Sequence, residues 1–178
     1  MLRIIGIVGI VVFVLVAGVL TVAATRPDVF RVERSASIKA PPDKIFPHIN
    51  DFRRWVAWSP WEKKDPALKR TYGTTSGGKG ATYAWEGNNE VGVGRMEISE
   101  SVPPSKVAIK LDFVRPFEAH NDVVFTLEPR GDTTNVRWTM QGNTPYFAKI
   151  IHLFFDMDKM VGTDFEAGLA GLKAIAEK

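Results

Sequence analysis

The chain has 178 residues, of which 45% are hydrophobic, and it carries 23 basic residues, 20 acidic residues and no cysteine. This length suits one domain with one core, and the absence of cysteine excludes a thiol nucleophile while being compatible with either an oxidising or a reducing compartment. The formal charge of +3 comes without a long basic run, which excludes the electrostatic pattern of a nucleic-acid-binding protein.

The first feature in chain order is an uncharged apolar run of 21 residues, residues 4–24. A helix rises about 1.5 Å per residue and the hydrocarbon core of a bilayer is about 30 Å thick, so about 20 apolar residues are needed to cross it. Arg3 precedes the run and Arg26-Pro27 ends it. We therefore expect residues 1–26 to form a single-pass transmembrane anchor and residues 27–178 to form a separate domain.

Two alternatives for this segment stay open. A cleaved signal peptide would have its small-residue cleavage site at Val22-Ala23-Ala24, although the apolar run is longer than an ordinary signal core. A buried core helix is less favoured, because the segment is apolar all round and has no polar stripe to face water.

Two arguments about the side of the membrane on which the domain lies disagree. Lysines and arginines are more numerous just after the apolar run than before it, which favours a cytoplasmic domain. A short N-terminus before one long domain more usually sends the domain outward, and long domains translocate largely regardless of charge. We expect the domain to lie outside the cytoplasm.

The domain begins with an alternating apolar pattern over residues 30–39, which predicts a strand. Pro42 then suits the first turn of a helix, and Asp43 suits its positive end. A second short helix is expected at residues 51–55, followed by an aromatic turn at residues 58–61. The predicted order at this point is a strand and two short helices.

Alternation of apolar and polar residues then recurs in about six segments. These predicted strands lie near residues 69–74, 81–86, 94–101, 106–113, 121–128 and 135–141. Connections of about 4–8 residues are typical of hairpins, and an apolar face opposite a polar face is typical of an antiparallel sheet with one dry side.

The last part of the domain changes its period. From Pro145 to Ile175 the apolar residues are spaced by three and four, which predicts one long amphipathic helix that bends near Gly162. Such a helix is long enough to cover the apolar face of a strongly curved sheet. Because it cannot fill the concavity of that sheet by itself, the remaining volume is left for side chains or for a ligand.

Four stretches of the sequence resemble those of one protein superfamily. They are residues 34–38 followed by 40–46, residues 49–52 with Trp55, residues 58–62, and residues 162–166 with Gly168-Leu169. Over about residues 30–177 the chain is similar to the START-like, or SRPBCC, superfamily, which includes a polyketide cyclase/dehydrase and lipid-transport group. The resemblance implies an α+β helix-grip fold, in which a curved antiparallel sheet grips the long C-terminal helix, here preceded by a transmembrane helix. It also implies that an apolar molecule is held between sheet and helix.

We expect ten apolar side chains to surround such a ligand, from the concave face of the sheet, the aromatic turn and the long helix. They are Trp58, Trp61, Trp85, Phe113, Phe125, Trp138, Met140, Phe154, Met157 and Val161. Ligand sites are mostly apolar with a few polar groups, which fits this set. The alternative for each residue is plain core packing.

No catalytic residue, metal ligand or cofactor is assigned. His48, His120 and His152 are far apart in sequence and none has metal-ligand spacing, so each is interpreted as a surface or capping histidine. Asp156 and Asp158 are interpreted as solvated, and a cavity-facing one would need a partner such as Arg115 or Arg137. The glycine-rich segments lack nucleotide-binding spacing, and no Gly-x-Ser-x-Gly motif occurs.

Three functions are therefore considered. The first is a membrane-anchored domain that binds a small apolar or lipid-like ligand, with the bilayer as its second partner and without nucleic acid. The second is a cyclase- or dehydratase-type enzyme with a hydrophobic substrate, which requires an ionisable residue inside the cavity. The third is an interaction or envelope-stress module with a filled cavity.

Overall fold

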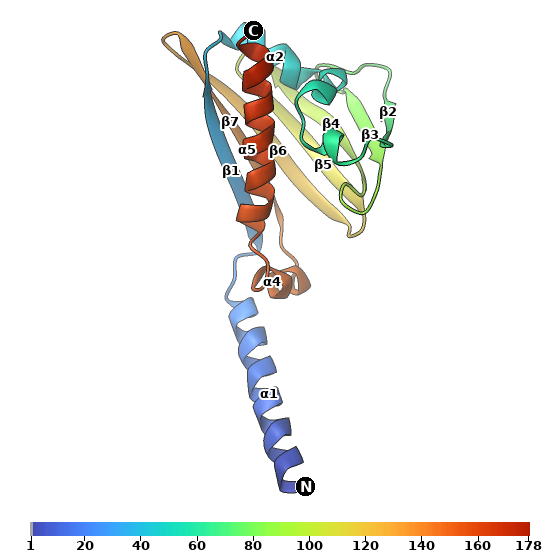
Figure 1. The fold of residues 1–178 in the computed structure, drawn as a ribbon, viewed down its shortest axis with the longest axis vertical. Helices are drawn as coiled ribbons and strands as arrows, with labels where there is room; N and C mark the ends of the chain where they lie inside the picture. The colour runs from blue at the N-terminus through green and yellow to red at the C-terminus, as the bar shows by residue number, and fades with distance from the viewer. Residues whose placement is uncertain (1) are drawn as a thin grey trace.

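Seven β-strands form one curved antiparallel sheet in a computed structural model, which describes residues 2–178 (Figure 1). The strands are β1 (Val29–Ile38), β2 (Lys69–Tyr72), β3 (Thr82–Glu86), β4 (Val93–Val102), β5 (Lys106–Arg115), β6 (Ala119–Arg130) and β7 (Thr133–Asn143). The helices are α1 (Leu2–Ala24), α2 (Pro42–Asn50), the 3₁₀ helix η1 (Phe52–Ala57), α3 (Trp61–Lys64), α4 (Tyr146–His152) and α5 (Met157–Ala176). The strand order β1-β7-β6-β5-β4-β3-β2 confirms the predicted α+β helix-grip fold.

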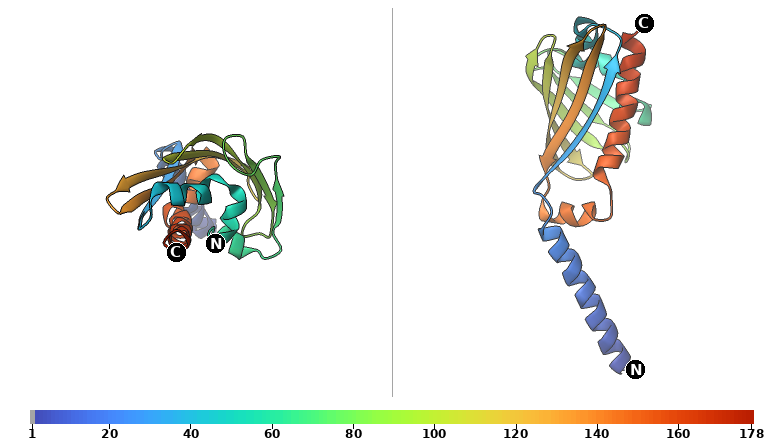
Figure 2. Two further views of the ribbon diagram at one scale, coloured as in Figure 1. Left: turned by 90° about the horizontal axis from the view of Figure 1, so that it is seen from above. Right: turned by 90° about the vertical axis from the view of Figure 1, so that its left-hand side faces the viewer.

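The concave face of the sheet is covered by α5, which lies over β1, β7 and β6 (Figure 1), and the sheet curves around it (Figure 2). The alternation that predicts the strands is reproduced in their burial: on β6, Val123, Phe125 and Leu127 are buried, whereas Val124 and Thr126 are partly exposed. The core therefore lies between the inner face of the sheet and α5.

The helix α1 extends away from the domain and ends next to α4 (Figure 1). Within residues 2–178 it is the one helix that is long and apolar enough to cross a membrane, and a signal sequence would have the same length and composition. Its side chains are exposed over most of its length, whereas Ala23 near its end is fully buried.

The single long C-terminal helix predicted from the apolar spacing is wrong in one respect: the chain forms two helices, α4 and α5, separated at residues 153–156. The break comes before Gly162, because Asp156 caps α5 by accepting a hydrogen bond from the Lys159 backbone N–H at 2.9 Å. Aspartate is favoured at this position, where it satisfies an otherwise unpaired backbone donor. The apolar residues keep their spacing of three and four across residues 153–156, so this spacing gives no sign of the break.

The predicted aromatic turn at residues 58–61 also differs from the structure, since Trp61 begins the short helix α3.

Glycine residues on α5 allow it to approach both the sheet and the segment after η1 closely. A Cβ atom at Gly168 would lie 2.7 Å from Cζ3 of Trp138, and one at Gly171 would lie 2.7 Å from the carbonyl oxygen of Trp58. The Trp138 indole is held in place because it stacks on the Phe165 ring, with centroids 4.1 Å apart and an angle of 9° between the planes. The position of α5 therefore depends on the absence of side chains at these two sites.

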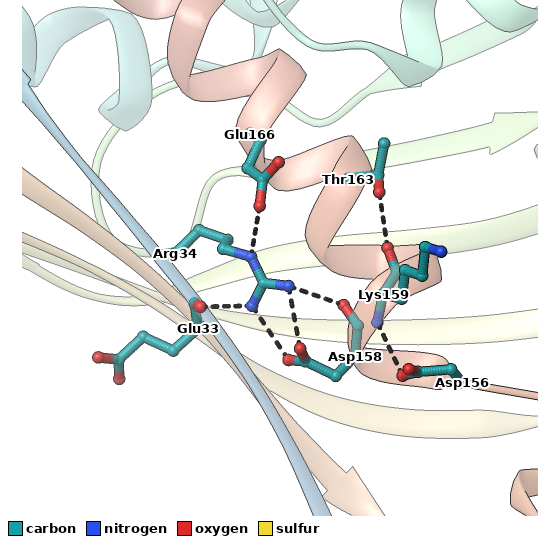
Figure 3. A network of polar contacts seen from close by, with 7 residues as sticks. All are labelled: Glu33, Arg34, Asp156, Asp158, Lys159, Thr163 and Glu166. Atoms are coloured by element: carbon teal, nitrogen blue, oxygen red, sulfur yellow. Dashed lines mark hydrogen bonds and ion pairs between the residues drawn. The ribbon is translucent and has the colours of Figure 1, made fainter.

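A cluster of charged groups holds the N-terminal half of α5 on β1 (Figure 3). Arg34 donates hydrogen bonds to the carboxylate oxygens of Asp158 at 3.0 Å and to Glu166 at 2.8 Å. The hydrogen bonds from Arg34 lower the pKa of the Asp158 carboxyl, and those accepted by Asp158 and Glu166 raise the pKa of the Arg34 guanidinium. The partner of Asp158 is thus Arg34, and not Arg115 or Arg137 as considered from the sequence.

Gly168→Ala is expected to destabilise the protein. Overpacking a core costs about 1–3 kcal/mol, while alanine recovers about 1 kcal/mol of helix propensity, so the net loss is up to about 2 kcal/mol. Urea unfolding of the full chain in detergent measures the difference. The control is Ala170→Gly at an exposed position of the same helix. It measures the difference in helix propensity between alanine and glycine without any change in core packing. A Gly168→Ala variant that gains as much stability as Ala170→Gly loses would contradict the packing argument.

Arg34→Gln is expected to loosen the start of α5, so that backbone amides of residues 158–166 exchange faster with solvent. The folded-state pKa of Asp158 lies below its unfolded-state value, so its contribution is present above about pH 4 and is lost as the pH falls. The stability difference between wild type and Arg34→Gln should therefore shrink between about pH 7 and about pH 3. A difference that does not change with pH argues against the pairing. The control is Arg130→Gln, which removes an exposed ion pair between Arg130 and Glu128, both of which lie on β6.

Candidate functional site

An aromatic cluster occupies the space between the middle of the sheet and α5. Trp138 on β7 lies 4.7 Å from Phe125 on β6 and 5.6 Å from Trp58, measured between ring centroids. Trp55, which lies on η1, packs against Trp58 with the ring centroids 4.9 Å apart. Edge-to-face and offset contacts of this kind stabilise a core beyond the area that they bury.

Four of the sequence-predicted ligand contacts belong to this buried core. Trp58, Phe125, Trp138 and Met140 are buried, and the three aromatic residues among them touch one another. The centre of the volume that the sequence left for side chains or a ligand is therefore filled with side chains. Core packing, the alternative considered for each residue, describes these four.

Four further predicted contacts lie at the border of the cluster and are partly exposed: Trp61, Trp85, Phe113 and Val161. Trp61 packs edge-to-face on Trp138 at 5.7 Å, and Trp85 packs in the same way on Phe113 at 5.8 Å. We call these four residues the aromatic rim. They lie on α3, β3, β5 and α5, at the margin of the buried core.

Phe154 is placed differently from its prediction. It lies in the connection between α4 and α5 and its side chain is exposed, as is that of Phe155. The prediction assigns it to the inner face of one continuous helix. Because the helix breaks at residues 153–156, the periodic argument does not apply at this position. Phe154 is therefore not part of the space between sheet and helix.

A cavity of about 300 Å³ lies at the end of the domain nearest α1, bounded by the start of β1, α4 and the start of α5. We call it the basal cavity. Its apolar lining consists of Pro27, Val29, Phe30, Val32 and Met157. Its polar lining consists of Arg26, Arg31, Thr144, Lys149, His152 and Asp158. Met157 is the member of the predicted set that lines it.

The polar groups of the basal cavity have distinct environments. Nζ of the buried Lys149 donates to Asp28 at 2.6 Å. The His152 ring packs edge-to-face on Phe30 at 6.3 Å, and burial lowers the pKa of its imidazole, which favours the neutral form. The buried Thr144 hydroxyl has no hydrogen-bond partner among the described residues. An unpaired buried hydroxyl is costly, which makes Thr144 a candidate contact for a polar group of a ligand.

A second concavity, of about 360 Å³, lies over β2 to β5. Arg95, Glu97, Lys110 and Asp112 line it, and they alternate along their strands with the buried residues Met96 and Leu111. Arg95 and His120 both pair with Asp112, at 3.0 Å and 2.7 Å. The hydrogen bond to Asp112 raises the pKa of the His120 imidazole. This mixed charged surface does not resemble an apolar ligand site.

Of the three histidines, His152 alone lines the basal cavity. His48 is partly buried on α2, and burial lowers its pKa, whereas His120 lies on β6, outside the cavity. Within residues 2–178, no group of three or more His, Asp or Glu side chains is arranged to hold a metal ion.

Sequence reasoning missed most of the basal cavity, including Phe30, Thr144 and Lys149. Lys149 is the one residue of the cavity that the sequence could have indicated, because it is the single lysine, arginine, aspartate or glutamate in the apolar stretch from residue 145 to residue 155. Its partner Asp28 lies 121 positions earlier in the chain, so the pair cannot be read from local spacing.

Comparison with known proteins identifies the family and the fold. A family model described as polyketide cyclase / dehydrase and lipid transport matches residues 29–177. No curated protein sequence matches the chain.

Several solved structures share the fold. Protein CV1439 from Chromobacterium violaceum is 14% identical with a TM-score of 0.59, covering 86% of this chain and 99% of its own. Aha1 from Colwellia psychrerythraea, solved as a dimer, is 18% identical with a TM-score of 0.59, covering 83% and 96%. TTHA0849 from Thermus thermophilus is 17% identical with a TM-score of 0.59, covering 83% and 97%.

At these identities the solved structures support the fold alone. The family model spans most of the chain and all the strands of the sheet. This protein therefore belongs to the polyketide cyclase/dehydrase and lipid transport family.

Proposed function

We propose that this protein is a membrane-anchored domain that binds a small hydrophobic or lipid-like molecule between its sheet and its C-terminal helix. The length and apolar character of α1 support the anchor. The family description, which names lipid transport, supports the class of ligand. In this proposal the domain lies outside the cytoplasm, at the surface of the bilayer in which an apolar ligand concentrates.

The basal cavity is the observation that carries the proposal. Its volume of about 300 Å³ is at the lower end of the range of ligand sites, about 300–1,000 Å³. Five apolar residues and six polar or charged residues line it, a composition that suits a molecule with both an apolar part and a polar group. Arg26 and Pro27, which lie two and three residues after the end of α1, form part of its wall. An apolar molecule leaving the bilayer would therefore meet this cavity first.

The proposal gives the predicted residues different roles. Met157 is a direct ligand contact in the basal cavity. The aromatic rim is an additional apolar wall that a ligand longer than the cavity would contact. Trp58, Phe125, Trp138 and Met140 support these surfaces by packing behind them.

The test is native mass spectrometry of the full chain, purified from its host membranes in mild detergent, followed by solvent extraction. We expect one lipid or isoprenoid class to remain bound to the wild type. Met157→Trp places a larger side chain in the basal cavity, and an overlap costing about 1.4 kcal/mol lowers the affinity about tenfold, so less ligand is retained through purification.

Met160→Trp is the matched control, because Met160 lies on the same helix, is exposed and does not line the cavity. Equal amounts of ligand on both tryptophan variants would place the ligand elsewhere. A wild type that carries no ligand and excludes apolar fluorophores would favour the interaction-module function, which the filled centre of the domain also suits.

One observation favours an enzyme as the second candidate: His152 is an ionisable residue inside the basal cavity with a lowered pKa. A neutral imidazole near pH 7 is able to act as a general base. In that case His152→Gln would abolish turnover of an apolar substrate while leaving its binding unchanged, and His48→Gln would keep both. Activity that persists in His152→Gln excludes this role.

A further inference from the structure

The corner formed by α4 and the start of α5 exposes an unusual amount of aromatic surface. It consists of Tyr146, Phe147, Phe154, Phe155 and Met160, which we call the apolar corner. The four aromatic side chains are between 47% and 69% exposed. Exposed apolar patches of this kind mark binding surfaces for proteins or membranes.

On α4 the usual pattern of burial is reversed, with a lysine buried and an aromatic side chain exposed. Lys149 points inward and is buried against Asp28, whereas Phe147 on the same helix is 68% exposed. Helices at a protein–water boundary bury their aromatic residues and expose their lysines. The arrangement therefore indicates that the outer side of α4 does not face water.

A hydrogen bond determines the depth of this corner relative to α1. The hydroxyl of Tyr146 donates to the backbone carbonyl of Leu20 at 2.7 Å. Leu20 lies four residues before Ala24, the end of the apolar run, or about 6 Å along the helix at about 1.5 Å per residue. If α1 spans the bilayer, Tyr146 lies at the boundary between hydrocarbon and headgroups, where tyrosine is enriched.

The backbone of the corner is suited to that boundary. The N–H groups of Phe154 and Phe155 both donate to the Ile151 carbonyl, at 3.0 Å and 3.1 Å. Unpaired backbone groups are costly in an apolar environment, so these bonds lower the cost of inserting the loop. The nearby charges are mixed, because Arg26 and Arg31 line the basal cavity together with Asp158, and Lys149 pairs with Asp28, so attraction to anionic lipids is not required.

We propose that the apolar corner inserts into the interface of the bilayer that α1 crosses, and so fixes the domain against the membrane surface. This rests on the membrane anchor of the proposed function. The partner is the lipid surface itself, contacted by the exposed aromatic side chains and by Met160. Insertion brings the basal cavity, which α4 and α5 border, to the level of the headgroups.

The absence of cysteine from the native chain allows a direct test. Phe147→Cys and Phe155→Cys are each labelled with an environment-sensitive fluorophore on the full chain, reconstituted in phosphatidylcholine vesicles containing doxyl-labelled phosphatidylcholine. Val14→Cys, in the middle of the apolar run, reports on the anchor. Val56→Cys is the control, since Val56 is exposed on η1, next to α2 at the end of the domain remote from α1 (Figure 1).

We expect labels at positions 147 and 155 to emit further to the blue than the label at 56, with quenching strongest when the doxyl group is near the headgroup. Quenching at 14 but not at 147 and 155 would overturn the insertion and leave the anchor intact, including the case in which a second copy covers the corner. Absence of quenching at 14 would overturn both the anchor and the insertion.

Discussion

The close packing of α5 on the concave face of the sheet is the constraint on which the rest of the domain depends. The helix approaches β7 because Gly168 carries no side chain, it approaches the Trp58 backbone after η1 because Gly171 carries none, and Phe165 stacks on Trp138 beside these contacts. This contact buries Trp58, Phe125 and Trp138 in the centre of the domain. The start of α5 is set separately, by the cap at Asp156.

The consequence for the candidate site is that it lies at the end of the domain nearest α1. Arg34 ties the first turns of α5 to β1, and the space below that contact is the basal cavity. Helix α4 borders this cavity with Lys149 and His152 and presents Tyr146 and Phe147 on its outer side. A domain held in this way would exchange ligands with the bilayer over a short distance, without exposing them to water. Family membership alone does not choose between a carrier and an enzyme, because one fold hosts many activities.

Much of the fold follows from the sequence, because it depends on local periodicity. Alternation along each strand reflects a sheet with one dry face, and the long uncharged run of residues 4–24 has the length of a membrane-crossing helix. The strand positions and the two early helices follow from such local patterns, whereas the family resemblance combines stretches at residues 34–62 and 162–169. The aromatic character of the space beneath the last helix is also visible, because Trp85, Phe113, Phe125 and Trp138 alternate with polar residues.

What only the tertiary structure decides is which apolar residues pack together and which stay accessible. Periodicity assigns Trp138 and Phe113 to the same face, but the approach of α5 buries the first and leaves the second partly exposed. The break between α4 and α5 depends on a cap at Asp156, which reverses the exposure expected for Phe154. The basal cavity joins residues near positions 30 and 150, and the pairing of Lys149 with Asp28 spans that distance. Such contacts form because the last strand returns beside the first, and no local pattern encodes that proximity.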